Sequence, residues 1–253
     1  MKLTVCKHID VPELHLYGFS DWHLGSADCD EELIQRDVEI VKNDPASRVI
    51  VLGDILQCDL KHSKGDIYHQ KYSPSQQKRL AREMLEPIKD KILSIQGGNH
   101  DEGRSEEDAT PVLDIAEYLG VPYCQAETLL KIPVGCKSKN GKHVVYVAFA
   151  VHGWSNGRLW GSKAINLDRL KDLVPTADLF LMGHTHSQHV HKDTVFIPDL
   201  YNNNVMVKTR HFVNTGSYQR RGDYVRRKAL PGQCLGTSLI RLSGTQKKIT
   251  VEI

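Results

Sequence analysis

The chain has 253 residues, with a hydrophobic fraction of 40% and a charged fraction of 25%, as in an ordinary globular protein. The formal net charge of +2 provides no strong overall field to draw the chain to nucleic acid or to a membrane. No apolar run reaches the roughly 18 residues of a membrane-spanning helix, and the N-terminus lacks a signal peptide's apolar core, so we expect a cytoplasmic protein.

The six cysteines show no CxxC spacing, which argues against a zinc ribbon or a dithiol redox motif. We therefore expect six reduced thiols. Neither a repeat nor a linker divides the chain, so we predict a single domain over residues 1–253.

The first predicted strand covers residues 14–20 and ends at Asp21-Trp22-His23. A helix follows, with Ile34, Val38 and Val41 on one face, and closes at Pro45. Residues 48–52 form a continuous apolar run, typical of a strand buried on both faces, and lead to Gly53-Asp54.

A polar loop over residues 57–72 precedes a second helix, whose start is indicated by Ser73, Pro74 and Gln76. Leu80, Met84 and Ile88 form its predicted buried stripe. A short strand over residues 92–95 then leads to Gly97-Gly98-Asn99-His100-Asp101, where we expect the glycines to let the backbone turn sharply.

A third helix is predicted between Thr110-Pro111 and Gly120. A strand over residues 143–151 ends at His152-Gly153, and another over 179–182 ends at Gly183-His184-Thr185-His186, with a short helix between them. The remaining chain is predicted to be mostly β, in segments 194–197, 205–208, 211–213, 238–242 and 249–253.

Alternating strands and helices indicate an α/β fold with a largely parallel first sheet. In such sheets, ligands bind outside the carboxyl ends of the strands. The polar residues singled out above all follow strands, so we expect them to converge.

Seven of these residues offer oxygen or imidazole nitrogen ligands: Asp21, His23, Asp54, Asn99, His152, His184 and His186. Seven mixed ligands are too many for one metal ion and suit two divalent ions that share a bridging carboxylate. Thiolates are absent from the set, which argues against a structural zinc site.

The motifs Asp-x-His, Gly-Asp, Gly-Asn-His-Asp, His-Gly and Gly-His-x-His, in this order, resemble the calcineurin-like metallophosphoesterase superfamily. The resemblance covers residues 21–186 and implies a four-layer α-β-β-α sandwich. Two facing mixed β-sheets would carry a dinuclear metal site at the carboxyl ends of their strands.

Carried over by motif, the resemblance places Asp21, His23 and His186 on the first metal. Asn99, His152 and His184 would bind the second, and Asp54 would bridge both. The implied ions are Mn²⁺ first, with Fe²⁺, Zn²⁺ or Ni²⁺ as alternatives.

The same resemblance implies hydrolysis of phosphoric esters by a metal-bridging hydroxide. His100 would protonate the leaving oxygen or stabilise the phosphate, and Asp101 would orient the His100 ring.

The run of residues 20–25 is similar to the DNA-repair exonuclease branch, although this chain is too short for that branch's additional domains. The layout is also similar to stand-alone phage and bacterial phosphoesterases. Candidate substrate-binding residues are Arg104, Trp154, Arg158 and Trp160, and the basic stretch 220–228 is a further candidate.

We predict a phosphodiesterase acting on nucleotides or nucleic acid, with Trp22, Trp154 and Trp160 forming a groove with stacking faces. A phosphomonoesterase, acting on proteins or small molecules, is the alternative within the enzyme class. A scaffold that has lost catalysis is the alternative outside that class, and the complete ligand set argues against it.

Overall fold

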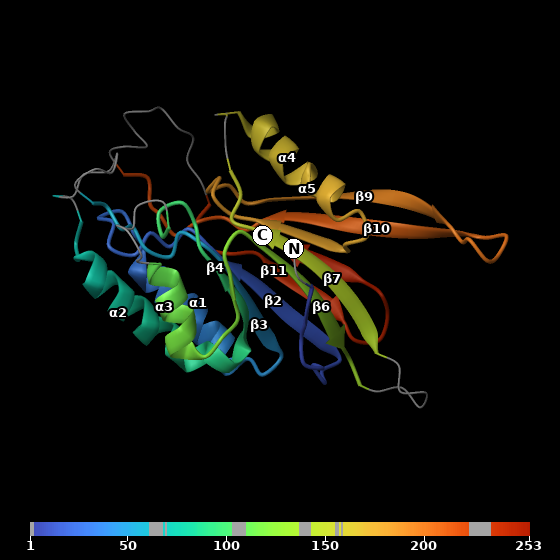
Figure 1. Ribbon diagram of the computed structural model, residues 1–253, viewed down its shortest axis with the longest axis horizontal. Coiled ribbons are helices and arrows are strands. Elements are labelled where there is room, and N and C mark those ends of the chain that lie inside the picture. The colour runs from blue at the N-terminus through green and yellow to red at the C-terminus, as the bar shows by residue number, and fades with distance from the viewer. Residues whose placement is uncertain are drawn as a thin grey trace.

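The computed structural model describes residues 3–60, 68, 70–102, 110–136, 143–154, 157, 159–222 and 234–253. Two six-stranded mixed sheets form the centre of this part of the chain (Figure 1). The first contains, in spatial order, β12 (Ile249–Glu252), β11 (Leu239–Ser243), β2 (Glu13–Phe19), β3 (Ser47–Leu52), β4 (Ile92–Gln96) and β5 (Tyr123–Cys124). The second contains β1 (Leu3–Val5), β6 (Glu127–Val134), β7 (Val144–Val151), β8 (Leu179–Met182), β10 (Val205–Asn214) and β9 (His189–Pro198).

Three separate hydrophobic cores define four layers. One core joins α1 (Glu31–Asn43), α2 (Pro74–Leu85) and α3 (Pro111–Leu119) to the first sheet. A second lies between the sheets, where Leu16 and Ile50 share a cluster with Leu130 and Leu181. The third joins α4 (Trp160–Asp168) and α5 (Leu170–Leu173) to the second sheet. The predicted four-layer α-β-β-α arrangement with two mixed sheets is therefore confirmed.

The parallel part of the first sheet sets the position of the functional loops. Strands β2, β3, β4 and β5 pair in parallel, whereas β11 and β12 add antiparallel strands at one edge. In the second sheet, β8 pairs in parallel with both β7 and β10. The loops that follow β2, β3, β4, β7 and β8 carry the predicted ligands, so the topology gathers them at strand carboxyl ends.

The predicted helix ends have the expected capping contacts. Ser73 and Gln76 form a capping box at the start of α2, and Gly120 ends α3 in the left-handed conformation. The predicted stripe of α2 was wrong in register, because its buried residues are Gln77, Ala81 and Leu85. Leu80 and Met84 are only partly buried.

The third residue of the predicted stripe, Ile88, is buried but does not belong to α2. It lies in the 3₁₀ helix η2 (Glu86–Lys91), which follows α2 directly. Gln77 occupies the buried position in α2 because its amide accepts from the Cys58 N–H and donates to the Tyr72 carbonyl. These contacts hold the preceding loop against the helix.

Other differences concern β structure. The segments predicted at 205–208 and 211–213 are one continuous strand, β10, and β9 begins at His189 rather than Thr194. Strands β1, β5 and β6 were not predicted. All six cysteines are free, as expected. Within the described residues, no helix is long and apolar enough to cross a membrane.

Candidate dinuclear metal centre

Five of the predicted ligands have a backbone conformation that residues with a side chain seldom adopt. Asp21, His23, Asp54, His184 and His186 have φ values between 48° and 63°, in the left-handed region that favours glycine. Parallel backbone hydrogen bonds brace two of these loops, from Asp21 N–H to Gly53 O and from His23 N–H to Asp54 O, both 3.0 Å. The sharp turns direct the ligands out of their strands towards one centre.

Glycines in these loops allow close approach of the chain. A β-carbon at Gly98 would lie 2.2 Å from Oδ1 of Asp54, and one at Gly53 would lie 2.7 Å from the Gly98 nitrogen. The structure thus corrects the expected role of Gly97 and Gly98, since neither has a positive φ. At Gly98 the glycine is needed because the Asp54 carboxylate packs against its backbone.

The first cluster contains Asp21, His23 and His186, with one ligand atom of each within 4.8 Å of the others. Nε2 of His23 lies 3.0 Å from Nε2 of His186. Oδ1 of Asp21 lies 3.2 Å from the same His186 nitrogen and has no hydrogen-bond partner. Its other oxygen accepts from the Ser20 hydroxyl and the His184 N–H, so Oδ1 is the oxygen left for a cation.

The second cluster contains Asp54, His152 and His184. Nε2 of His152 lies 3.1 Å from Nδ1 of His184 and 3.2 Å from Oδ1 of Asn99. Oδ2 of Asp54 lies 3.2 Å from Nε2 of His152 and 3.9 Å from Nε2 of His23. A single carboxylate oxygen therefore faces both clusters, while Oδ1 accepts from the His100 N–H.

The side chains fit two divalent ions. Two imidazole nitrogens that each lie 2.0–2.1 Å from one ion are about 3 Å apart. That is the spacing of the His23–His186 pair and of the His152–His184 pair. Lone pairs facing each other at this distance repel unless a proton or a cation lies between them. The unpartnered Asp21 oxygen points to the same conclusion.

Hydrogen bonds to the second ring nitrogen set the direction of two of these rings. Nδ1 of His152 lies 2.7 Å from the Leu52 carbonyl, and Nδ1 of His23 lies 2.9 Å from Oε1 of Gln57. A proton on each Nδ1 completes these bonds and leaves Nε2 as the metal ligand. Gln57 is in turn held by Asp59, through a 2.8 Å bond from its amide.

Sequence reasoning missed Gln57, which comes three residues after Asp54 in the predicted polar loop. It missed Ser20 too, whose hydroxyl lies 2.6 Å from Asp21 and 2.8 Å from Oγ1 of Thr215. The Asn-Thr-Gly-Ser-Tyr run at 214–218 was the one signal that could have found this contact. In the structure, Ser217 and Tyr218 both donate to the Asp21 carbonyl.

His100 lies beside the first cluster. Its ring is 4.5 Å from that of His23, nearly perpendicular, and one of its ring nitrogens approaches His23 and Asp54 closely enough to form a third possible ligand group. Nδ1 of His100 lies 3.2 Å from the Gln57 carbonyl. These contacts place His100 at the edge of the centre.

Asp101 has a different place from the one expected. Its carboxylate accepts from the backbone N–H groups of Ile55, Leu56 and Gly98 at 2.8–3.2 Å. The expectation that it orients the His100 ring is wrong, because both its oxygens face backbone. Asp101 instead joins the loops that carry Asp54 and Asn99.

Burial and mutual charge shift the pKa values of the ligands. Burial would raise the pKa of Asp21, but His186 and His152 outweigh it and hold that pKa at about 2. Burial opposes protonation of His152, whereas the Asp54 carboxylate raises the pKa of that imidazole to about 10. A metal ion bound by His152 would displace this proton, because an imidazole that ligates a metal is neutral.

The remaining substrate candidates divide into three groups. Arg104, Arg158 and the stretch 223–228 lie outside the described residues. Trp154 lies in the loop after β7, which also carries His152, and has an exposed fraction of 37%. Trp160 is the first residue of α4 and has an exposed fraction of 56%. Trp22 was wrongly assigned to the groove. It is fully buried against Phe19 and Tyr218 in the helix-side core, with the next residue, His23, turned to the site.

No family model and no curated protein matches this chain. Among solved structures, a metallophosphoesterase from Sphaerobacter thermophilus is 14% identical, with 94% of this chain and 87% of that chain covered and a TM-score of 0.42. A conserved uncharacterised protein from Streptococcus pneumoniae TIGR4, described as a predicted phosphoesterase, is 13% identical, with coverages of 95% and 88% and a TM-score of 0.40.

Vps29 from Entamoeba histolytica, in complex with Zn²⁺, is 11% identical, with coverages of 94% and 97% and a TM-score of 0.39. At such identities and TM-scores, the likenesses do not by themselves define an activity.

Proposed function

We propose that the protein is a dinuclear metal-dependent phosphoesterase that hydrolyses phosphodiester bonds, with nucleotides or nucleic acid as the substrate class. The observation that carries the proposal is the position of the Asp54 carboxylate, whose Oδ2 faces His152 on one side and His23 on the other. Two divalent ions in such a site polarise a phosphoryl group and supply a nucleophile near neutral pH.

The protein's own groups would orient the ligands and handle the proton of the leaving group. Gln57 holds the His23 ring through its side chain and accepts from His100 through its carbonyl. With Nδ1 of His100 held in this way, Nε2 is the nitrogen that can carry a proton to a leaving oxygen. A histidine in this role commonly contributes a factor of about 10²–10⁴ to the rate.

The side chains around the centre favour a diester over a monoester. Besides burial, the charges acting on Asp21 are those of His186, His152 and Asp54, and those acting on Asp54 are of His152, His23 and His100. A monoester dianion carries an additional negative charge and would benefit from further cations. The exposed faces of Trp154 and Trp160 suit stacking against the arms of a nucleotide diester.

The complete ligand set argues for catalysis rather than a scaffold role. A scaffold has no need to keep seven converging ligands, five of them in unfavourable backbone conformations. The phosphomonoesterase alternative keeps the same metal chemistry and differs only in the substrate.

The test compares kcat/KM of Mn²⁺-loaded protein on bis-p-nitrophenyl phosphate and on p-nitrophenyl phosphate. We expect the diester to be the better substrate, and Asp54→Asn to reduce metal content and turnover together. A higher kcat/KM on the monoester would favour the phosphomonoesterase. Two bound ions with no turnover on either ester would favour the scaffold.

A further inference from the structure

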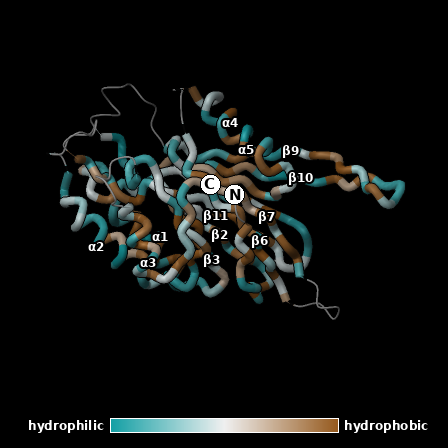
Figure 2. Tube along the Cα trace, viewed as in Figure 1, coloured by the Kyte–Doolittle hydropathy of each residue, from teal (hydrophilic) through white to brown (hydrophobic). Residues whose placement is uncertain are grey.

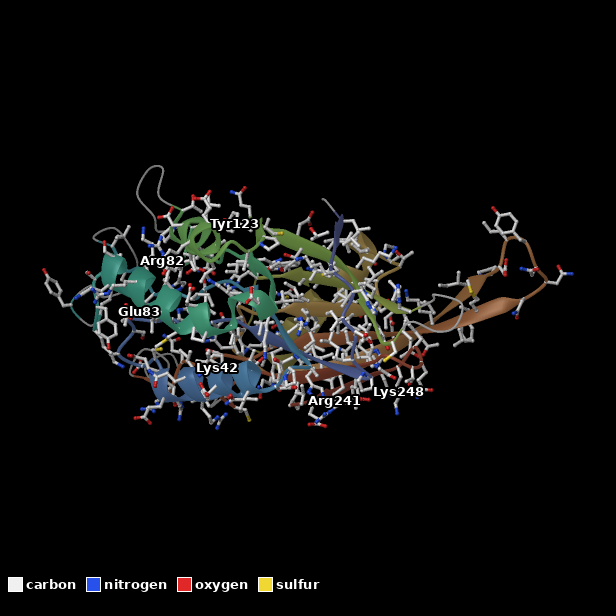
Figure 3. All side chains as sticks on the ribbon, turned by 90° about the horizontal axis from the view of Figure 1, so that it is seen from below. Lys42, Arg82, Glu83, Tyr123, Arg241 and Lys248 are labelled. Atoms are coloured by element: carbon white, nitrogen blue, oxygen red, sulfur yellow. The ribbon has the colours of Figure 1, made fainter. Side chains whose placement is uncertain are left out.

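The hairpin of β9 and β10 forms an arm that projects beyond the two sheets. Figures 1 and 3, whose views differ by 90°, both show its outer half extending away from the rest of the molecule. We define the arm as residues 194–209. Its strands pair in antiparallel register from Thr194↔Thr209 to Pro198↔Val205.

The arm exposes an unusual amount of apolar surface. Six of its large apolar side chains have exposed fractions between 52% and 93%: Phe196, Leu200, Tyr201, Val205, Met206 and Val207. In Figure 2, hydrophobic colouring continues along both strands and gives way to hydrophilic colouring at the turn. Together these side chains expose on the order of 600 Å², a patch of the size that marks interaction sites.

The register places apolar side chains on both faces of the ribbon. Phe196 pairs directly with Val207, so these two side chains share one face. Met206 pairs with Ile197, and because side chains alternate along a strand, this pair lies on the opposite face. Because the arm projects beyond the two sheets, the rest of the molecule does not cover both of these apolar faces.

The arm carries almost no charge of its own. Asp199 and Lys208 are the only charged residues between positions 194 and 209. The Asp199 carboxylate accepts from Tyr201 and Asn202 within the turn, and Lys208 pairs with Asp178 at 2.9 Å. Such a surface has no unpaired cation for the phosphates of a nucleic acid or for anionic lipid headgroups.

The arm also ends its sheet. Strand β9 is the last strand in the order and pairs only with β10 among the described strands. Within the part of the chain that the structure describes, no strand pairs with the outer edge of β9, and an unpaired apolar edge is prone to pairing with another strand.

We propose that the arm is a self-association surface, through which two copies of the chain pair by their β9 edges, so that apolar side chains of the two arms pack against each other across the new strand pair. In a two-fold interface the same surface patch of both copies meets itself. A neutral patch satisfies that requirement, whereas a charged one would repel itself. Edge pairing covers only part of the roughly 600 Å² per copy, so the interface is smaller than the roughly 800 Å² per partner of a stable complex and should be reversible at micromolar concentrations.

The association does not depend on the proposed phosphoesterase activity. Strand β9 starts three residues after the ligand His186 and leads away from it. At about 3.3 Å per residue, Phe196 lies roughly 30 Å along the chain from that ligand.

The test is sedimentation velocity between about 1 and 100 µM for the wild-type protein, Phe196→Glu and Leu173→Glu. Leu173 is a matched control, because its exposed fraction is 57% and it lies in α5, outside the arm. We expect the wild-type and control proteins to dimerise. A charge introduced into the apolar contact by Phe196→Glu, one in each copy, should weaken dimerisation by at least about 100-fold.

Hydrogen exchange provides a second measurement. Amides of β9 should be protected at high protein concentration and lose protection on dilution, with circular dichroism showing that both variants remain folded. A wild-type monomer at 100 µM would overturn the proposal and leave the arm to a different protein partner. A Phe196→Glu variant that dimerises as well as the wild type would also overturn it, because the interface would then lie elsewhere.

Discussion

At the scale of single residues, the metal centre depends on backbone strain that its surroundings maintain. Each non-glycine residue in the left-handed region costs on the order of 1 kcal/mol or more, and five ligands adopt it. Asp21 is fixed from three directions, by hydrogen bonds from Ser20, from the His184 N–H and from Ser217. Such contacts keep the ligands close to their binding geometry before any ion arrives.

His100→Ala tests the role of the nearby imidazole. We expect both ions to remain bound, because the clusters retain all seven ligands, while turnover falls by about 10²–10⁴-fold. The loss should be smaller for p-nitrophenolate esters, whose leaving group needs less protonation, than for alkyl esters. Equal losses for both leaving groups would show that His100 positions the phosphate instead. A loss of metal would show that it is a ligand.

Gln57→Leu tests the contact that orients His23. Removing the acceptor for the Nδ1 proton should lower the affinity for Mn²⁺ or Zn²⁺ by about 10–100-fold, measured by calorimetric titration of the metal-free protein. Gln219→Leu is the control, because the Gln219 side-chain amide donates to the Ser26 hydroxyl and, within the described residues, forms no hydrogen bond to a predicted ligand. Unchanged affinity in Gln57→Leu would mean that the His23 ring is held well enough by its packing.

The gathering of the candidate ligands into two clusters could be predicted from sequence, because each follows an apolar strand in a short motif and chain order alone implies convergence. Gln57 could not, since nothing in a polar loop indicates which amide will meet an imidazole. Asp101 shows the same limit. Its neighbour in sequence is His100, but the turn directs its carboxylate to the backbone of a loop 45 residues earlier. Side-chain direction within a turn depends on tertiary contacts.

At the scale of elements, the strands read best from sequence were those buried on both faces, such as β3 and β8. Strand β10 was divided in two because Arg210 interrupts its apolar pattern. In the structure, Arg210 pairs directly with Asp193 of β9 through two hydrogen bonds of 2.5 and 2.8 Å. A cross-strand ion pair of this kind keeps a charged residue inside a strand. Pro133 similarly weakened the signal of β6.

Helix α4 contributes a positioning contact that tests how elements support the centre. Lys163 is buried in α4 and donates to the carbonyl of Thr185, between the ligands His184 and His186, and to the Ser187 hydroxyl. Lys163→Met keeps the length of the side chain but removes the charged donor of that carbonyl, which then keeps only the 3.2 Å hydrogen bond from the Ser187 hydroxyl. We expect about 10-fold or more weaker metal binding, together with a changed visible spectrum of the Co²⁺-substituted protein.

The control is Lys171→Met, which removes an exposed ion pair with Asp168 in the neighbouring helix. If both lysine variants bound metal as the wild type does and gave the same Co²⁺ spectrum, Lys163 would serve only to anchor α4. A changed spectrum in Lys163→Met alone would assign it a role in positioning the two histidines.

At the scale of the whole molecule, three stacked cores hold the loops of both sheets at one end. The inter-sheet core is built from apolar residues on the inner faces of the two sheets, and Leu16, Ile50, Ala148 and Leu181 are all fully or almost fully buried there. Periodicity alone predicted an α/β protein, and only the resemblance implied two facing sheets. The reason is physical: which strands face each other is decided by long-range packing rather than by local pattern.

The pH dependence of stability should reveal one buried imidazole outside the metal clusters. His189 at the start of β9 is 3% exposed, packs against Trp160 at 4.8 Å and stacks on His191. Burial, followed by the charges of His191 and Lys163, lowers its pKa from 6.5 to about 4. Below pH 6.5 the unfolded chain binds a proton at this site that the folded protein refuses, so stability falls as the pH drops from 6.5 towards 4.

His189→Phe keeps an aromatic ring between Trp160 and His191 and removes the titrating group. Between pH 7 and pH 4.5, the wild-type protein should lose roughly 2 kcal/mol more free energy of unfolding than this variant. Urea denaturation with excess chelator at both pH values measures the difference, because protonation of the six titratable ligand side chains is then common to the two proteins. Equal losses would mean that water or rearranged side chains accept the His189 proton in the folded state.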